Sequence, residues 1–193
     1  YPRTDSRYLT EDAAPVLEQL VPAVTTLFHV SGEVALNTEQ VINNKKVSDH
    51  HAIIPTKSGA GVNLETLPKG EQEILRLISI RLLAAVSEPY RFVETTVTAE
   101  CAGEIFTSKG KVVVSEGWKG IVNQFFPEKI ISERTVPDTE TDAVFPVTNA
   151  EIKEGKTSPP KHFTEDTLLS AMETAGADEM PEDVERKGLG TPA

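Results

Sequence analysis

Residues 71–101 read EQEILRLISIRLLAAVSEPYRFVETTVTAEC, and the hydrophobic period changes within this stretch. Before Pro89, apolar side chains recur every three or four residues, which predicts a helix over residues 71–88. Its main stripe is Ile74, Leu77, Ile78, Leu82, Ala85 and Val86, widened by Leu75, Ile80 and Leu83. Pro89 ends the helix, and alternation from Val93 to Cys101 then predicts a strand. The chain is therefore expected to be α+β, with a domain boundary near residues 88–91.

The β-rich region continues beyond Cys101. Ile105-Phe106 and residues 111–114 are apolar runs on either side of Ser108-Lys109-Gly110. They predict antiparallel strands joined by a tight turn at those three residues. A further strand is expected around residues 144–153.

Helices are also expected near both ends of the sequence. Apolar residues recur at helical spacing over residues 8–30. Pro15 fits only a first turn, so this helix should begin near Ala14, and Pro22 should kink or split it. Near the other end, Thr164 is expected to cap a helix at its N-terminus.

The composition excludes several classes of protein. Of the 193 residues, 38% are hydrophobic and 25% charged, as in a folded, soluble chain. No window approaches the ~20 apolar residues of a membrane helix, and a signal peptide is not expected, because residues 1–5 contain no apolar run. Cys101 is the only cysteine, which excludes an intramolecular disulfide and a cysteine-based zinc site and fits a cytoplasmic protein. Taken alone, the net charge of −11 argues against a phosphate-binding surface.

The opening segment, Tyr1-Pro2-Arg3-Thr4-Asp5-Ser6, combines groups suited to phosphoryl transfer. A tyrosine hydroxyl can act as a covalent nucleophile, but its usual pKa of about 10 makes it weak at neutral pH without help. Arg3 is a permanent cation that can hold a phosphate through two hydrogen bonds. From these residues alone, the favoured interpretation is a polar terminal strand or loop in which Tyr1 packs as an ordinary aromatic residue.

A second candidate is Asp49-His50-His51-Ala52-Ile53-Ile54-Pro55-Thr56. Neighbouring residues in an extended segment point to opposite sides, so His50 and His51 are poorly placed to share one metal ion. A single histidine near a phosphodiester can donate a hydrogen bond or transfer a proton. The structural alternative is a loop histidine that binds a backbone carbonyl.

Four motifs together resemble the type IA DNA topoisomerases. The opening segment is similar to the family's active-site tyrosine motif, and the segment from Asp49 to Thr56 resembles a second motif in the form typical of topoisomerase III. Residues 157–172 resemble a third motif, and Gly188-Leu189-Gly190-Thr191-Pro192-Ala193 is similar to the start of a fourth. The motifs occur in the family's order and span the chain, which is expected to be the middle part of a longer enzyme.

The resemblance implies a mechanism. Tyr1 would attack a phosphodiester of single-stranded DNA and form a 5′-phosphotyrosyl bond, which a 3′-hydroxyl later reseals without ATP. Arg3 would stabilise the charge on the phosphate, and His50 would contact the phosphate or the tyrosine. Asp5 would be a supporting residue, and Thr191 a DNA contact.

The resemblance also implies an architecture and a cofactor. Residues 1–88 would form part of a mainly helical gate domain that carries the tyrosine, residues 89–157 an antiparallel β-rich arch, and residues 158–193 the start of a helical DNA-binding domain. Magnesium would be bound by a domain that precedes Tyr1, and no metal is expected on this chain, which alone should be inactive. No membrane contact is expected.

Two other functions compete with this interpretation. One is a noncatalytic module that binds DNA or protein, in which Tyr1 is structural. The other is a nuclease or relaxase with a tyrosine nucleophile and an unrelated fold. That class would need a histidine cluster around one metal, for which the spacing here is poor.

Overall fold

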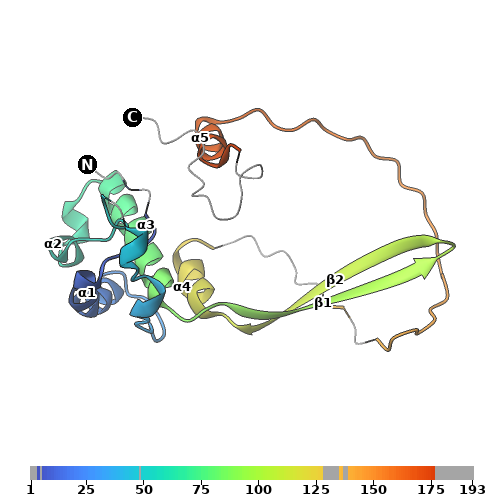
Figure 1. Ribbon diagram of the computed structural model, residues 1–193, viewed down its shortest axis with the longest axis horizontal. Coiled ribbons are helices and arrows are strands. Elements are labelled where there is room, and N and C mark those ends of the chain that lie inside the picture. The colour runs from blue at the N-terminus through green and yellow to red at the C-terminus, as the bar shows by residue number, and fades with distance from the viewer. Residues whose placement is uncertain (1–3, 5, 48, 128–134, 137–138, 177–193) are drawn as a thin grey trace. The chain divides into compact units, whose positions relative to one another are not determined.

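A computed structural model describes residues 4, 6–47, 49–127, 135–136 and 139–176 of the chain, which forms two compact units, residues 1–143 and 144–193. The first unit contains α1 (Ala14–Leu27), α2 (Lys57–Ala60), α3 (Lys69–Val86), β1 (Arg91–Cys101), β2 (Glu104–Ser115) and α4 (Gly117–Phe125), and the second contains α5 (Glu165–Thr174) (Figure 1). Single turns of 3-10 helix occur at Glu11–Ala13, Thr38–Gln40, Asn44–Lys46 and Leu64–Thr66. Helices and one antiparallel sheet confirm the predicted α+β class.

The hydrophobic core of the first unit is built on α1 and α3. Its least exposed apolar side chains, at most 2% exposed, are Leu9, Leu17, Leu20, Val24, Ile80, Leu83 and Val86. As predicted, α1 begins at Ala14, with Pro15 in its first turn. Of the two outcomes expected at Pro22, a kink or a split, the split is wrong, because α1 continues to Leu27. Buried residues on both sides of Pro22 keep the helix packed through the residue that lacks an N–H.

The helix predicted over residues 71–88 is confirmed as α3, but its buried face differs from the predicted stripe. Ile74 and Leu77 are 60% and 45% exposed, whereas Ile80 and Leu83 are fully buried. The buried face contains Ser79, which is 0% exposed. The sequence pattern counts only apolar residues as buried, so it did not include Ser79 in the buried face of the helix. The predicted face was therefore rotated relative to the observed one.

Two serines are buried along this segment: Ser79 within α3 and Ser87 immediately after its last residue. Ser79 Oγ has no hydrogen-bond partner among the described residues, whereas Ser87 Oγ donates to the carbonyl oxygen of Leu83 over 2.6 Å. An unpaired buried hydroxyl lowers stability, and removing it relieves that cost. We expect Ser79→Ala to leave the free energy of unfolding unchanged or raise it by up to about 1 kcal/mol, and Ser87→Ala to lower it by about 1 kcal/mol. Urea denaturation measures both free energies of unfolding. A larger loss for Ser79→Ala than for Ser87→Ala would contradict the assignment of Ser79 as the serine without a hydrogen-bond partner.

Strands β1 and β2 form a two-stranded antiparallel hairpin. The turn predicted at residues 108–110 is wrong, because these residues lie inside β2. The chain instead reverses at Ala102 and Gly103, whose φ angles are +52° and +83°, and Cys101 pairs with Glu104. Two residues with positive φ suit the right-handed twist of a short hairpin. Ala102 gave no sequence signal for this turn, since alanine rarely adopts positive φ.

Helix α4 follows β2 directly and was not predicted from the sequence. Its start is tied to the end of α3 by the N–H of Trp118, which donates to the carbonyl oxygen of Glu88 over 2.8 Å. Near its other end, the side-chain amide of Gln124 accepts from the N–H of Ser31 over 2.8 Å and donates to the carbonyl oxygen of Ser31 over 3.0 Å. These bonds, together with buried Ile121, hold α4 against the core.

The second unit has helix α5 and a long irregular segment before it. The helix is capped as predicted: Thr164 Oγ1 accepts from the N–H of Thr167, and the N–H of Thr164 donates to Thr167 Oγ1. The strand expected over residues 144–153 is wrong, because these described residues form neither helix nor strand. They have no ladder partner, and an apolar alternation alone does not make a strand.

Candidate functional site

The segment that follows Tyr1-Pro2-Arg3 is held against two later parts of the chain. Leu9, which is 2% exposed, anchors it in the core. The N–H of Leu9 donates to the carbonyl oxygen of Val41 over 2.8 Å, and the carbonyl oxygen of Leu9 accepts from the N–H of Asn43 over 2.9 Å. The carbonyl oxygen of Tyr8 accepts from the N–H of Ala52 over 2.8 Å. The opening segment is therefore joined by backbone bonds to the histidine-containing segment.

Two hydroxyl side chains extend this contact toward the N-terminus. Thr4 Oγ1 donates to the carbonyl oxygen of His50 over 3.2 Å and accepts from the N–H of Ser6 over 3.1 Å. Ser6 Oγ donates to the carbonyl oxygen of Lys46 over 2.8 Å and accepts from the N–H of Tyr8 over 3.1 Å. Serine and threonine favour such bonds because their short side chains reach nearby backbone groups. Two motifs that lie 46 residues apart in sequence thus meet at Thr4 and His50.

The two adjacent histidines have different surroundings. Both side chains are exposed. His51 Nδ1 lies 2.6 Å from the carbonyl oxygen of Ala52, so a proton on that nitrogen donates to the backbone. The His50 ring has no hydrogen-bond partner within the described part of the chain. The loop histidine that binds a carbonyl is therefore His51, and the His50 ring is open to an external group.

A lysine that the sequence analysis did not select lies beside the opening segment. Lys46 Nζ is 3.3 Å from Tyr8 Oη and 4.9 Å from the centroid of its ring. Arg7 and Lys45, both exposed, adjoin these residues in the sequence. The Lys45-Lys46 pair was visible in the sequence, but its place follows from the 3-10 turn at Asn44–Lys46 and from a contact across 38 residues. Such exposed cations favour an anionic ligand.

The remaining predicted site residues are not among those that the structure describes. Tyr1, Arg3, Asp5 and Thr191 all lie outside the described residues. Of the predicted set, the structure places His50, whose backbone carbonyl oxygen accepts a hydrogen bond from the Thr4 side chain.

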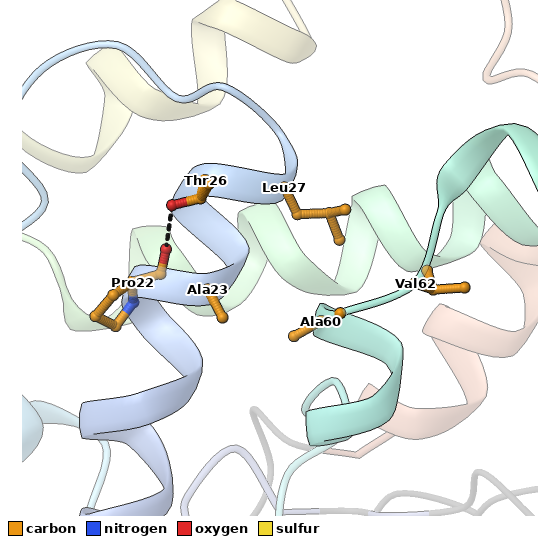
Figure 2. A pocket seen from close by; sticks show the side chains of 7 residues that line it. Pro22, Ala23, Thr26, Leu27, Ala60 and Val62 are labelled. Atoms are coloured by element: carbon orange, nitrogen blue, oxygen red, sulfur yellow. Dashed lines mark hydrogen bonds between the residues drawn. The ribbon is translucent and has the colours of Figure 1, made fainter.

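A separate apolar pocket lies between α1 and α2 (Figure 2). Its volume is about 450 Å³, and its lining residues are Pro22, Ala23, Thr26, Leu27, Ala60, Gly61 and Val62. The Thr26 hydroxyl already donates to the carbonyl oxygen of Pro22 over 3.0 Å, as the dashed line in Figure 2 shows. The pocket therefore lacks the convergent polar groups that an active site requires, and the chemistry is better sought at Thr4 and His50.

The described residues also bear on metal and membrane binding. Nowhere among them do three side chains of His, Cys, Asp or Glu gather closely enough to hold a metal ion. Within the same ranges, none of the helices is sufficiently long and apolar to cross a membrane.

Comparisons with known proteins agree on one family. The family model described as DNA topoisomerase matches residues 1–193. The chain is similar to the protein named DNA topoisomerase 3 from Bacillus licheniformis, with 38% identity over 186 residues, which cover 92% of this chain and 25% of that protein. The Bacillus subtilis protein of that name is 36% identical over the same coverage, and the Staphylococcus aureus one is 35% identical over 90% of this chain and 24% of its own length. The chain thus spans about a quarter of the length of these relatives.

Proposed function

This chain belongs to the type IA DNA topoisomerases and is similar to topoisomerase III, and we propose that it is the strand-cleaving segment of such an enzyme. Its substrate would be single-stranded DNA in the cytoplasm. The bond between Thr4 and His50 is the observation that carries the proposal, because it joins the tyrosine motif to the histidine motif. Since Tyr1 is three residues from Thr4, even an extended chain keeps their Cα atoms within about 11 Å.

The proposed reaction is a transesterification. Tyr1 Oη attacks the phosphorus of one phosphodiester, the 3′-oxygen leaves and takes up a proton, and the 5′-phosphate remains bonded to the tyrosine. The reverse attack by the 3′-hydroxyl restores the strand and frees the tyrosine. One phosphoester bond replaces another in each direction, so no ATP is consumed.

Two side chains would assist this reaction. Arg3 would neutralise the charge that develops on the phosphate oxygens, for which a guanidinium is well suited. The exposed His50 ring would donate a hydrogen bond to a phosphate oxygen or to the tyrosine. Asp5 would orient Arg3, and Thr191 would contact the strand.

The remaining parts of the chain would serve the same activity. Residues 1–88 would form the gate domain that carries the tyrosine, residues 89–157 the arch, and residues 158–193 the start of a DNA-binding domain. The magnesium that the family resemblance implies finds no group of ligands among the described residues. The proposal places the metal in another part of the full-length enzyme.

The polarity of the covalent bond tests the proposal. The full-length enzyme is incubated with single-stranded DNA labelled at one end and then denatured. A 3′-end label should remain with the protein, whereas a 5′-end label should migrate as a shorter strand with a free 3′-hydroxyl. A label that remains with the protein only from the 5′ end would contradict the proposed bond. If neither label is retained, the noncatalytic module becomes the better interpretation.

The 193-residue chain alone should not relax supercoiled DNA in the presence of magnesium. The reason is that its described residues offer no metal site and it spans about a quarter of its relatives' length. Gel analysis of plasmid topoisomers measures this. If the chain relaxed DNA at a rate comparable to that of the full-length enzyme, these 193 residues would be sufficient for relaxation and the prediction would be wrong.

Thr4 provides a milder test of the same site. Thr4→Val keeps the shape of the side chain but removes the bonds to His50 and Ser6. We expect the rate of strand cleavage by the full-length enzyme to fall about tenfold, because of these two bonds only the one to His50 joins the two motifs, and one hydrogen bond contributes about 1 kcal/mol. Noncovalent DNA affinity should change little. Thr4→Ser retains the hydroxyl and should cleave at nearly the original rate. Equal rates for both variants would show that the contact does not position the site.

A further inference from the structure

Three aromatic rings and two lysines gather where the hairpin joins α4. We call this group, Tyr90, Phe92, Lys111, Trp118 and Lys119, the foot cluster. Lys111 Nζ lies 4.0 Å from the ring centroid of Phe92 and 4.6 Å from that of Tyr90. Lys119 Nζ lies 5.0 Å from the Tyr90 centroid and 6.0 Å from that of Trp118. The rings of Tyr90 and Phe92 are 5.5 Å apart and inclined at 39°.

The register of the hairpin places Phe92 on its polar face. Phe92 pairs with Val113, and the next pair on the same face is Glu94 with Lys111. The nearby ion pair of Glu94 is with Lys109, at 3.5 Å, while Lys111 turns toward the two rings. Phe92 is 46% exposed. A large ring left half in water on a polar face contributes little to the core.

The chemistry of the foot cluster fits a single-stranded nucleic acid. Bases stack on exposed aromatic rings irrespective of their sequence, and neighbouring ammonium groups attract the phosphates between them. A double helix presents stacked base pairs and no free base faces, so it would not use these rings. We propose that the foot cluster binds a single strand by stacking bases on Phe92 and Tyr90, with Lys111 and Lys119 contacting its phosphates.

This site is formed by residues 90–119 and is therefore distinct from the contact between Thr4 and His50. It rests on the proposed function only for the identity of the strand as DNA. The rival explanation is a structural one, in which the lysines and rings merely brace the base of the hairpin. A brace needs the same five side chains but predicts no affinity for bases.

Trp118 makes the test specific, because it is the only tryptophan in the chain. The 193-residue chain is titrated with a short oligothymidylate and with an abasic oligomer that has the same number of phosphates. We expect oligothymidylate to bind more tightly and to quench Trp118 fluorescence, whereas the abasic oligomer should bind weakly with little quenching. Equal affinity for the two oligomers, or no binding of either, would overturn the proposal.

Variants locate the contact. Phe92→Leu should weaken the binding of oligothymidylate by roughly 5- to 150-fold, the loss expected for one stacked base, without affecting the abasic oligomer. Phe92→Tyr retains a ring and should bind normally. Phe106→Leu is the matched control, since Phe106 pairs with Ala99 on the opposite face of the hairpin and is 60% exposed. Loss of affinity in Phe106→Leu equal to that in Phe92→Leu would contradict the assignment.

Lys111→Gln removes one positive charge and leaves all three rings of the foot cluster in place. It therefore provides a second test of the proposal if Phe92→Leu disturbs the fold. It should weaken both oligomers alike and reduce the salt dependence of binding by about one counterion. An unchanged salt dependence would exclude Lys111 from the phosphate contact and overturn that part of the proposal. None of these measurements involves strand cleavage. An enzyme that forms the tyrosine adduct but shows no stacking would refute the foot cluster alone.

Discussion

Tyr1→Phe in the full-length enzyme should abolish the covalent protein–DNA adduct and lower strand cleavage by roughly 10⁴-fold or more, the scale expected when a nucleophile is removed. Phenylalanine has nearly the same shape but lacks the oxygen that would attack phosphorus. Affinity for uncleaved single-stranded DNA should change little, because the ring and the neighbouring cations remain. Denaturing gels with labelled DNA measure the adduct, and mobility shifts measure the affinity.

Tyr8→Phe is the matched control for this variant. Tyr8 lies in the same segment, and its hydroxyl is 3.3 Å from Lys46 Nζ. Its loss removes one exposed hydrogen bond, so cleavage should fall only slightly. If Tyr1→Phe still formed the adduct and Tyr8→Phe did not, the nucleophile would have been misassigned.

Gly117→Ala should lower the free energy of unfolding by about 2–4 kcal/mol. Gly117 has a φ of +44°, and a Cβ atom there would lie 2.5 Å from the carbonyl oxygen of Glu88. The backbone of Glu88 and Pro89 passes close to Gly117, because the last residue of β2, Ser115, pairs with the first residue of β1, Arg91. The added methyl group must therefore displace main chain rather than a mobile side chain.

Gly103→Ala separates the two causes of this loss. Gly103 also has positive φ, +83°, but no atom lies within 4 Å of the position that its Cβ would take. Only the conformational cost applies there, about 1 kcal/mol. Urea denaturation of the 193-residue variants measures the difference. Equal losses for the two variants would show that crowding at Gly117 is not the cause.

The elements best predicted from the sequence were those with a local cause. The start of α1 follows from Pro15, which favours a first turn. The helix that became α3 follows from its long apolar repeat, and the start of α5 follows from the cap at Thr164. The alternation after Pro89 correctly predicted β1. Each of these signals lies within a few residues of the element that it specifies.

The features that were missed depend on distant residues or on conformations that the residue type disfavours. Helix α4 is held by Glu88 and Ser31, which are remote in sequence. The hairpin turn places Ala102 at positive φ. An alanine in the sequence does not indicate such a conformation, because this residue type rarely adopts it. The continuous α1 depends on burial around Pro22 that tertiary packing provides.

The candidate site was predictable as a set of motifs but not as a geometry. His50 was identified from its neighbours in the sequence, whereas its contact with Thr4 joins residues 46 positions apart. Lys46 was missed because its relation to Tyr8 exists only in the folded chain. Spacing along the chain cannot reveal such contacts, since they depend on how the loop of residues 41–52 returns to the opening segment.

The most direct test of the central claim is the identity of the residue that carries the DNA. The adduct of the full-length enzyme is trapped on single-stranded DNA, digested with nuclease and protease, and sequenced by mass spectrometry. The account predicts a nucleotide joined through its 5′-phosphate to the oxygen of Tyr1. A nucleotide on Tyr8, Tyr90 or any other residue, or an adduct joined through a 3′-phosphate, would contradict it.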